Sequence, residues 1–221
     1  MRPEQANIVS FTQNWHDAAK TQWDYKVTPF FNYIHDYIGV NYISAITGMS
    51  SDGGNYLQFA NHDAMLYGVD LAGSQILVAQ STAGTFKLTE TGSWQRGYTI
   101  NDGNSLYHMM PINMALSLTQ NLGHWTNVVE VKAIASKSEA NALMKERYTP
   151  GSGIVNLRTS YEWSSVRLDA GIDNVLNQQY YSPLGGVDLA DWGANGSSST
   201  SHPHALASPG RSFNAGVTVK F

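Results

Sequence analysis

The sequence predicts an all-β chain: an antiparallel transmembrane β-barrel segment of about nine strands. Three observations support this fold class. Apolar residues recur with a period of two, the connections alternate between short and long, and tryptophans flank the short connections. A period of two is typical of strands, because successive side chains on a strand point to opposite faces.

The alternation is clearest in the last strand. Phe213, Ala215, Val217, Val219 and Phe221 fall on one face, and polar residues or glycine fall on the other. Two interpretations fit this pattern. In a soluble β-sandwich the apolar face packs inward, whereas in an outer-membrane barrel it contacts lipid and the polar face lines the lumen. The alternation alone does not separate them.

The spacing of the connections favours the barrel. The predicted strands are 6–16, 22–36, 64–79, 84–97, 111–120, 124–136, 152–162, 165–175 and 211–221. Short turns are expected near 18–20, 81–84, 121–123 and 163–165, and long loops near 39–62, 96–107, 137–150 and 176–209. Short periplasmic turns opposite long extracellular loops are typical of outer-membrane barrels, and a sandwich has no reason to keep this asymmetry.

Four tryptophans agree with the barrel interpretation. Trp15, Trp23, Trp125 and Trp163 all flank predicted short turns. Aromatic side chains gather in this way at a membrane interface, so these four are predicted to form a girdle. The alternative is that they are four independent core residues.

The predicted strand 84–97 fits the pattern poorly. Glu90 falls on the same face as Phe86 and Leu88. A bulge or a wrong strand boundary would explain this, and the sequence does not choose between them.

Composition excludes several classes of protein. Charged residues make up 14% of the chain and the net charge is −4, with no basic stripe, which argues against a nucleic-acid partner. No cysteine is present, so disulfides and thiolate chemistry are excluded. No apolar run reaches the roughly 18–20 residues of a membrane helix, so a membrane could be crossed only by a closed barrel. No secretory signal follows Met1, so either the chain is a fragment or the membrane interpretation fails.

Several strings resemble the barrel of TonB-dependent outer-membrane receptors. In chain order they are Phe30 to Ile38 (FFNYIHDYI), Asn61 to Leu71 (NHDAMLYGVDL), Ile154 to Arg158 (IVNLR), Gly171 to Asn177 (GIDNVLN), Tyr180–Tyr181 and Pro209 to Phe213 (PGRSF). Each string is weakly specific, but together they cover essentially the whole chain in the family's order. His35 and His62 belong to these strings, so the resemblance implies that they serve the structure of the barrel and do not bind a metal.

The end of the chain resembles the insertion signal that the outer-membrane assembly machinery reads. Asn214, Gly216, Val219 and Phe221 carry its pattern of polar, glycine, apolar and terminal aromatic residues. A strand that closes a barrel needs an unbroken lipid face. The alternative is an ordinary edge strand.

A narrower resemblance is to the copper-receptor branch of the family. Its strings are Leu106 to Asn113 (LYHMMPIN), Gly123 to Asn127 (GHWTN) and Pro183 to Gly186 (PLGG). Imidazole and thioether ligands suit copper, so His108, Met109 and Met110 are the predicted metal-binding residues. The alternative is that both methionines are apolar rim residues and that His108 faces water.

No catalytic constellation is found, so the chain is not expected to be an enzyme. His16 and Asp17, and likewise His35 and Asp36, are neighbours on strands, so each pair should point to opposite faces. A small outer-membrane hydrolase would need clustered carboxylates. Glu162, Asp169 and Asp173 are candidates, but they alternate with Arg158 and Arg167, so charge pairing explains them more simply.

The resemblance implies metal uptake across the outer membrane of a Gram-negative cell. Residues 1–221 would be the last nine strands of a 22-stranded barrel, without the plug domain and the earlier strands, and inactive alone. The implied cargo is copper, or alternatively a siderophore–iron complex, with no resident cofactor. The implied partners are membrane lipid, the assembly machinery and, only through the missing plug, TonB. A soluble β-sandwich binding module is the remaining alternative.

Overall fold

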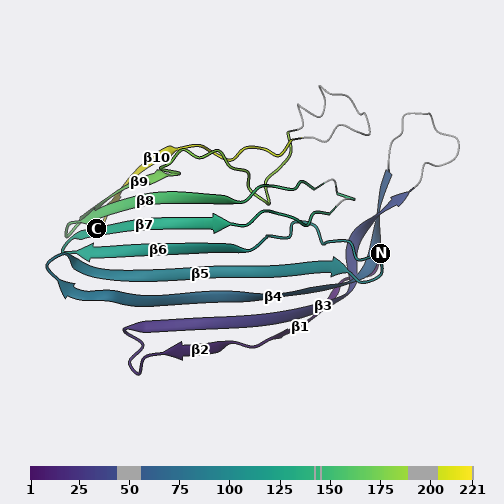
Figure 1. Ribbon diagram of the computed structural model, residues 1–221, viewed down its shortest axis with the longest axis horizontal. Helices are drawn as coiled ribbons and strands as arrows, with labels where there is room; N and C mark the ends of the chain where they lie inside the picture. Colours follow the sequence, from purple (N-terminus) through teal and green to yellow (C-terminus); the bar gives the residue numbers. More distant parts are fainter. Residues whose placement is uncertain (44–55, 142, 145, 189–203, 221) are drawn as a thin grey trace.

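The structure is a computed structural model that describes residues 1–43, 56–141, 143–144, 146–188 and 204–220. In this part of the chain ten antiparallel strands form one sheet, in the order β1-β3-β4-β5-β6-β7-β8-β9-β10, with β2 also paired to β3 (Figure 1). The strands are β1 (Gln5–Ser10), β2 (Gln13–His16), β3 (Trp23–Ile43), β4 (Tyr56–Ser81), β5 (Gly84–Thr99), β6 (Asn113–Leu122), β7 (Trp125–Ile134), β8 (Ser152–Glu162), β9 (Val166–Asp173) and β10 (Ser212–Val219). The predicted all-β fold is confirmed.

The connections alternate between short and long, as predicted. Residues 17–22, 82–83, 123–124 and 163–165 form short turns at one end of the sheet. At the other end, residues 100–112 join β5 to β6 and residues 135–151 join β7 to β8, and β3 ends and β4 begins there (Figure 1). No helix in the described residues is long and apolar enough to cross a membrane.

The sheet has one apolar and one polar face. The register of β7 to β10 places Val129, Leu157, Ile172 and Phe213 in one row on the apolar face. Phe213 is 74% exposed. Among the described residues the buried hydrophobic side chains are few, namely Ala64, Leu106 and Ile154. A soluble sandwich would bury this face against a second sheet, so the structure argues against that alternative.

The polar face carries the predicted charge pairs. Arg158 lies 2.9 Å from Asp173 and 3.4 Å from Glu130. Arg167 lies 2.8 Å from Asp169, and Lys220 pairs with Glu162. Each of these charged side chains therefore has a partner of opposite charge on the same face.

The predicted strand 6–16 is interrupted and forms β1 and β2. Both halves pair with β3 in one continuous register, Ser10 opposite Phe30 and Gln13 opposite Val27. The gap lies opposite Pro29, whose nitrogen cannot donate to the neighbouring strand. Phe11 N still donates to Pro29 O at 3.1 Å. The proline therefore divides one strand without moving it.

β3 and β4 run further than predicted, so the expected loop 39–62 is wrong. Their pairing continues to Ile43 opposite Tyr56, beyond a register shift between Ile34 and Tyr37. Asp36 lies in this bulge with a φ of 59°. A bulge breaks the period of two, which is why the alternation ended there in the sequence. The result is a hairpin extension that rises past the end of the other strands (Figure 1).

The same bulge corrects a second expectation. His35 Nε2 lies 3.4 Å from Asp36 Oδ2 and His35 Nδ1 lies 2.7 Å from Asp63 Oδ1. Adjacent residues share a face here because the bulge rotates Asp36. Asp36 also pairs with Arg2 at 2.6 Å, so this group of side chains links the segment ahead of β1 to β3 and β4.

Neither explanation proposed for Glu90 holds. Glu90 pairs with Gly73 on one side and with Leu116 on the other, and the register shifts of β4 with β5 lie lower, between Ile76 and Ser81. The start of the strand is also as predicted, since β5 begins at Gly84, and its later end at Thr99 does not change the face of Glu90. Glu90 therefore has the parity of Leu88 and lies on the apolar face.

Candidate functional site

The long-loop end is where the chain has cavities and loop-to-loop contacts. A buried ion pair ties its loops together: Lys137 and Glu146 have side chains that are 1% and 6% exposed, with Nζ 2.5 Å from Oε1. Glu146 also accepts hydrogen bonds from His108 N at 3.0 Å and Asn141 N at 2.8 Å. Lys137 Nζ donates to Pro183 O at 3.0 Å. One ion pair therefore connects the three loops that follow β5, β7 and β9.

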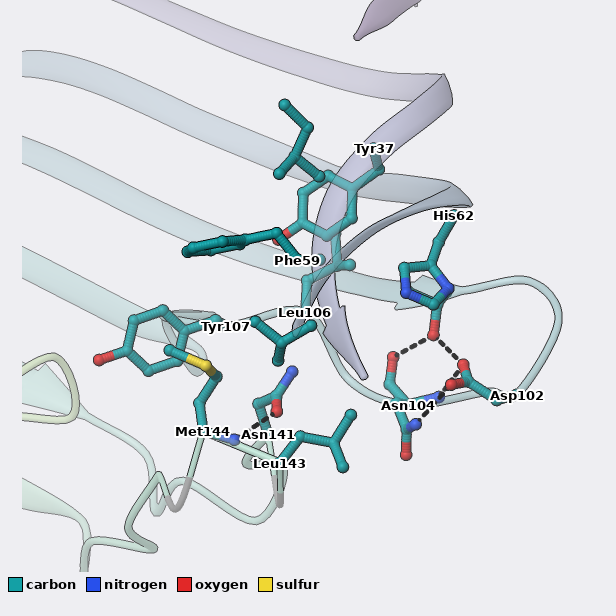
Figure 2. A pocket seen from close by; sticks show the side chains of 14 residues that line it. Tyr37, Phe59, His62, Asp102, Asn104, Leu106, Tyr107, Asn141, Leu143 and Met144 are labelled. Atoms are coloured by element: carbon teal, nitrogen blue, oxygen red, sulfur yellow. Dashed lines mark hydrogen bonds between the residues drawn. The ribbon is translucent and has the colours of Figure 1, made fainter. Parts of the chain in front are cut away.

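The larger cavity has a volume of about 210 Å³. It lies between the hairpin extension and the loops that follow β5 and β7 (Figure 2). His62 and Thr99 have the parity of the polar face, so the cavity opens on that side. Its lining residues are Tyr37, Ile38, Gly39, Val40, Phe59, His62, Thr99, Asp102, Asn104, Leu106, Tyr107, Asn141, Leu143 and Met144.

Packing against the sheet positions the β5–β6 loop. Leu106 is buried, and a Cβ on Gly97 would lie 2.8 Å from Leu106 Cδ1. Only glycine leaves room for this side chain, so the loop lies directly on the polar face of β5. Leu106 N also donates to Gly97 O at 2.9 Å. This contact brings the neighbouring residues of the loop to the cavity.

Polar groups gather at one end of this cavity. Figure 2 shows His62, Asp102 and Asn104 together there, with Tyr107 and Met144 toward the other end. Asp102 accepts hydrogen bonds from Thr99 Oγ1 and, at 2.7 Å, from Asn104 Nδ2. Burial raises the pKa of Asp102, but these hydrogen bonds and the nearby His62 imidazole outweigh it, so the pKa lies below the usual value. The carboxylate therefore stays ionised at neutral pH.

The predicted metal-binding residues do not share one cavity. Met109 and Met110 line a second, smaller cavity of about 150 Å³, together with Trp94, Arg96 and other residues. His108 is exposed, has a φ of 60° and stacks on Tyr107 with ring centroids 3.8 Å apart. Trp94 and Arg96 have the parity of the apolar face, so the methionines lie at its rim.

No group of three or more His, Cys, Asp or Glu side chains in the described part of the chain is arranged to hold a metal ion. Two of the three predicted ligands are thioethers, which are not among these four residue types, and Met109 and Met110 line the same cavity. Copper binding by His108, Met109 and Met110 stays a prediction.

All four predicted girdle tryptophans lie at the short-turn end and are exposed. Trp125 and Trp163 both contact Tyr161, with ring centroids 4.8 and 4.4 Å apart. Trp15 pairs in register with Tyr25, and Trp23 lies 6.3 Å from the same ring. The aromatic band is present, and its contact with membrane stays a prediction.

The predicted insertion signal lies on β10. Asn214 donates to Asp173 at 3.0 Å, and its side chain occupies the space above Gly171 on β9. Gly216 pairs with Asp169 and Val219 with Val166. Phe221 lies outside the described residues. Recognition by the assembly machinery stays a prediction.

Sequence reasoning missed His62 as a site residue, because it assigned this histidine to barrel geometry. His62 lies on the upper part of β4, opposite Tyr37. Its neighbours in the cavity come from loops forty and eighty residues away in the chain, such as Asp102 and Asn141. No local pattern in the sequence indicates that these residues line the same cavity.

Comparison with solved structures identifies the fold. The copper transporter OprC matches with a TM-score of 0.80 and 21% identity, over 100% of this chain and 32% of that one. This chain has the fold of a TonB-dependent receptor barrel. Two iron receptors also match: FyuA, the ferric yersiniabactin uptake receptor of Yersinia pestis (TM-score 0.66, 13% identity, 99% and 30% coverage), and the FrpB iron transporter of Neisseria meningitidis (0.64, 16%, 99% and 31%).

The chain spans about a third of the length of these solved receptors. These structures are outer-membrane receptors of Gram-negative bacteria. No protein-family model and no curated protein matches the sequence. In a barrel of this kind the apolar face contacts lipid and the polar face lines the lumen, as predicted for the two faces of the sheet.

Proposed function

We propose that the chain forms part of the wall of an outer-membrane receptor that takes up copper in a TonB-dependent manner. The observation that carries this proposal is the match to the copper transporter over the whole chain, with a TM-score of 0.80 against 0.66 and 0.64 for the two iron receptors. The sequence strings that resemble the copper branch support it independently. The placement of the chain in the outer membrane is part of the proposal.

The two faces of the sheet fit this role. The apolar face would contact lipid, and the charge-paired polar face would line a lumen through which cargo passes. The loops tied by Lys137 and Glu146 would form part of the extracellular mouth. Uptake in such receptors needs energy from TonB, which contacts a segment ahead of the plug. The chain would therefore form part of the barrel and would not itself receive this energy.

Uptake of radioactive copper by cells that produce the intact receptor tests the proposal. We expect uptake that saturates, that depends on TonB and that exceeds uptake of a ferric siderophore. Receptor-deficient cells and cells without TonB are the controls. Equal copper uptake with and without the receptor would contradict the proposal.

A siderophore–iron receptor is the second candidate, and the larger cavity favours it. That cavity is lined mostly by aromatic and aliphatic side chains, which suit the organic part of a metal complex better than a bare ion. Siderophores bring their own oxygen ligands, so such a receptor needs no thioethers. TonB-dependent uptake of a ferric siderophore without copper uptake would favour this candidate. A catalytic role is not part of either proposal.

A further inference from the structure

The larger cavity has aromatic walls that a ligand can reach. Tyr37 on β3, Phe59 on β4 and Tyr107 in the loop after β5 all line it (Figure 2). Phe59 is 64% exposed and Tyr107 is 40% exposed, so both rings are open to a molecule that enters. Exposed large apolar side chains around a concave surface are typical of a ligand-binding site. The electron-rich faces of aromatic rings also attract cations.

Asp102 brings a negative charge to the same cavity. Its hydrogen-bond donors are neutral groups, namely Thr99 Oγ1, Asn104 N at 3.3 Å and Asn104 Nδ2 at 2.7 Å. Such bonds hold the carboxylate in place and favour its ionised form. The described residues that line the cavity include no lysine and no arginine. An anion would therefore be disfavoured in this cavity, and a cation would be favoured.

A second carboxylate lies against the wall of the cavity. Glu4 Oε1 accepts a hydrogen bond from Ile38 N at 2.6 Å, and Ile38 is a lining residue. Arg2, which is close to Glu4 in the chain, is paired instead with Asp36 at 2.6 Å. Within the described part of the chain, neither Glu4 nor Asp102 makes a salt bridge. Both carboxylates therefore add negative potential to an aromatic cavity.

The rest of the lining favours a cation without N–H groups. Asn141 uses both ends of its amide, since it donates to Ser105 O at 2.8 Å and accepts from Met144 N at 3.0 Å. A primary ammonium group would exchange water for a wall with few free acceptors, which costs free energy. A quaternary ammonium group has no N–H group to satisfy, and its methyl groups pack against apolar side chains. A cavity of about 150 Å³ binds benzene in another protein, so one of about 210 Å³ has room for a trimethylammonium group.

We propose that this cavity binds an organic cation whose quaternary ammonium group lies against the rings of Tyr37, Phe59 and Tyr107. Asp102 supplies the opposite charge. Because the cavity opens on the polar face of the sheet, away from the face proposed to contact lipid, the ligand is a free compound in water and not a lipid headgroup. The site does not depend on which metal the receptor takes up, so failure of this site and failure of copper uptake are separate results.

Calorimetry on the intact receptor tests the proposal, in an uncharged maltoside detergent that contains no choline and at pH 8, where an ordinary histidine side chain is uncharged. The probes are choline, ethanolamine and dimethylbutanol, in which a carbon atom replaces the quaternary nitrogen of choline without changing its shape. We expect choline to bind about tenfold more tightly than dimethylbutanol, the size of a desolvated cation–aromatic contact. Ethanolamine should bind more weakly than choline, because its N–H groups lose water.

Variants locate the effect in this cavity. Asp102→Asn keeps the side-chain volume and removes the charge, so it should lower the affinity for choline and leave that for dimethylbutanol unchanged. Asp24→Asn removes the same charge at the opposite end of β3 and is the matched control. Phe59→Leu should reduce the preference for choline, because it keeps an apolar side chain without the ring. Phe59→Trp should retain the preference, since indole attracts cations at least as well.

Two results would overturn the proposal. The first is an unaltered receptor that binds choline no more tightly than dimethylbutanol, a comparison that needs no variant to fold. The second is an equal loss of choline affinity in Asp102→Asn and Asp24→Asn, because choline would then respond only to the net charge of the receptor. A loss confined to Asp102→Asn, together with the difference between Phe59→Leu and Phe59→Trp, would support the proposed site.

Discussion

A single carboxylate organises the first short turn. Asp17 accepts hydrogen bonds from four backbone N–H groups: those of Gln22 at 2.9 Å, Trp23 at 3.1 Å, Ala19 at 3.2 Å and Thr21 at 3.3 Å. The bond from Trp23 is the largest of the causes that lower the pKa of Asp17 from 3.8 to about 2. The charged form is therefore the one that the fold stabilises.

The stability that Asp17 contributes should depend on pH. Because the folded-state pKa is about 2 and the ordinary value is 3.8, Asp17 contributes stability above pH 3.8 that is lost as the pH falls through 2. We expect Asp17→Asn to be less stable than the unaltered receptor at pH 7 and equally stable below the lower pKa. Urea unfolding at several pH values measures the difference. A difference that does not change with pH would contradict this assignment.

Copper binding by the thioethers of Met109 and Met110 can also be tested at the scale of single residues. If Met109 and Met110 are copper ligands, replacing both with leucine removes soft donors while keeping the apolar volume. We expect copper affinity to fall by at least about tenfold, the smallest loss typical of groups that only orient a metal ligand. Met114→Leu, on the apolar face of β6, is the matched control. Unchanged copper affinity in the double variant would make these methionines rim residues.

Among the elements, the β4–β5 turn depends on a glycine. Gly84 has a φ of 89°, and a Cβ there would lie 2.2 Å from Asn121 O. Gly123, in the turn between β6 and β7, has a φ of 58° with nothing within 4 Å of a Cβ. The two glycines therefore share a left-handed backbone and differ in the space around it.

Alanine substitution should separate these two effects. Gly123→Ala is expected to cost about 1–2 kcal/mol, the ordinary cost of the left-handed region. Gly84→Ala adds a clash with backbone and should cost clearly more, because the β5–β6 pairing must shift. Urea unfolding of both variants measures the gap. Equal losses of stability in the two variants would mean that small shifts of the backbone relieve the clash at Gly84.

The Lys137–Glu146 pair is the corresponding feature of the loops. Lys137→Met leaves a buried carboxylate without its cation, which typically costs about 3–5 kcal/mol. Lys132→Met is the control, because Lys132 is half exposed and its pair with Glu130, at 3.2 Å, should be worth at most about 1 kcal/mol. Hydrogen exchange should show faster opening of residues 104–108 and 137–144 in the first variant alone. Similar exchange in both would contradict the linking role of this ion pair.

At the scale of the whole molecule, Glu90 tests the proposal that the apolar face of the sheet contacts lipid. Glu90 is on the apolar face, whereas Glu130 is on the polar face, where it accepts from Asn156 at 2.8 Å and lies near Arg158. Glu90→Leu should stabilise the barrel in lipid by about 1 kcal/mol, because a carboxylate there is unfavourable. Glu130→Leu should destabilise it by about 1–3 kcal/mol. Opposite signs in urea unfolding from lipid vesicles would support the assigned faces, and equal signs would contradict it.

Much of the fold could be predicted because its signals are local. The period of two assigns each residue to a face, and turn residues mark the connections, so most of the strands and the alternation of short and long connections were correct. The errors lie where a feature depends on a neighbouring strand. Pro29 interrupts a strand that pairs with it, and the bulge at Asp36 hides the further pairing of Tyr37 with His62.

The sequence by itself determined the all-β fold, the apolar and polar faces, the aromatic band and the resemblance to a receptor barrel, since each depends on residue spacing within one strand. Only the tertiary structure decided which loop residues meet. It separated His108 from Met109 and Met110, because the chain turns at His108 with a φ of 60°. It also joined His62 and Asp102 in one cavity, since contacts between distant segments are set by how loops fold onto the sheet.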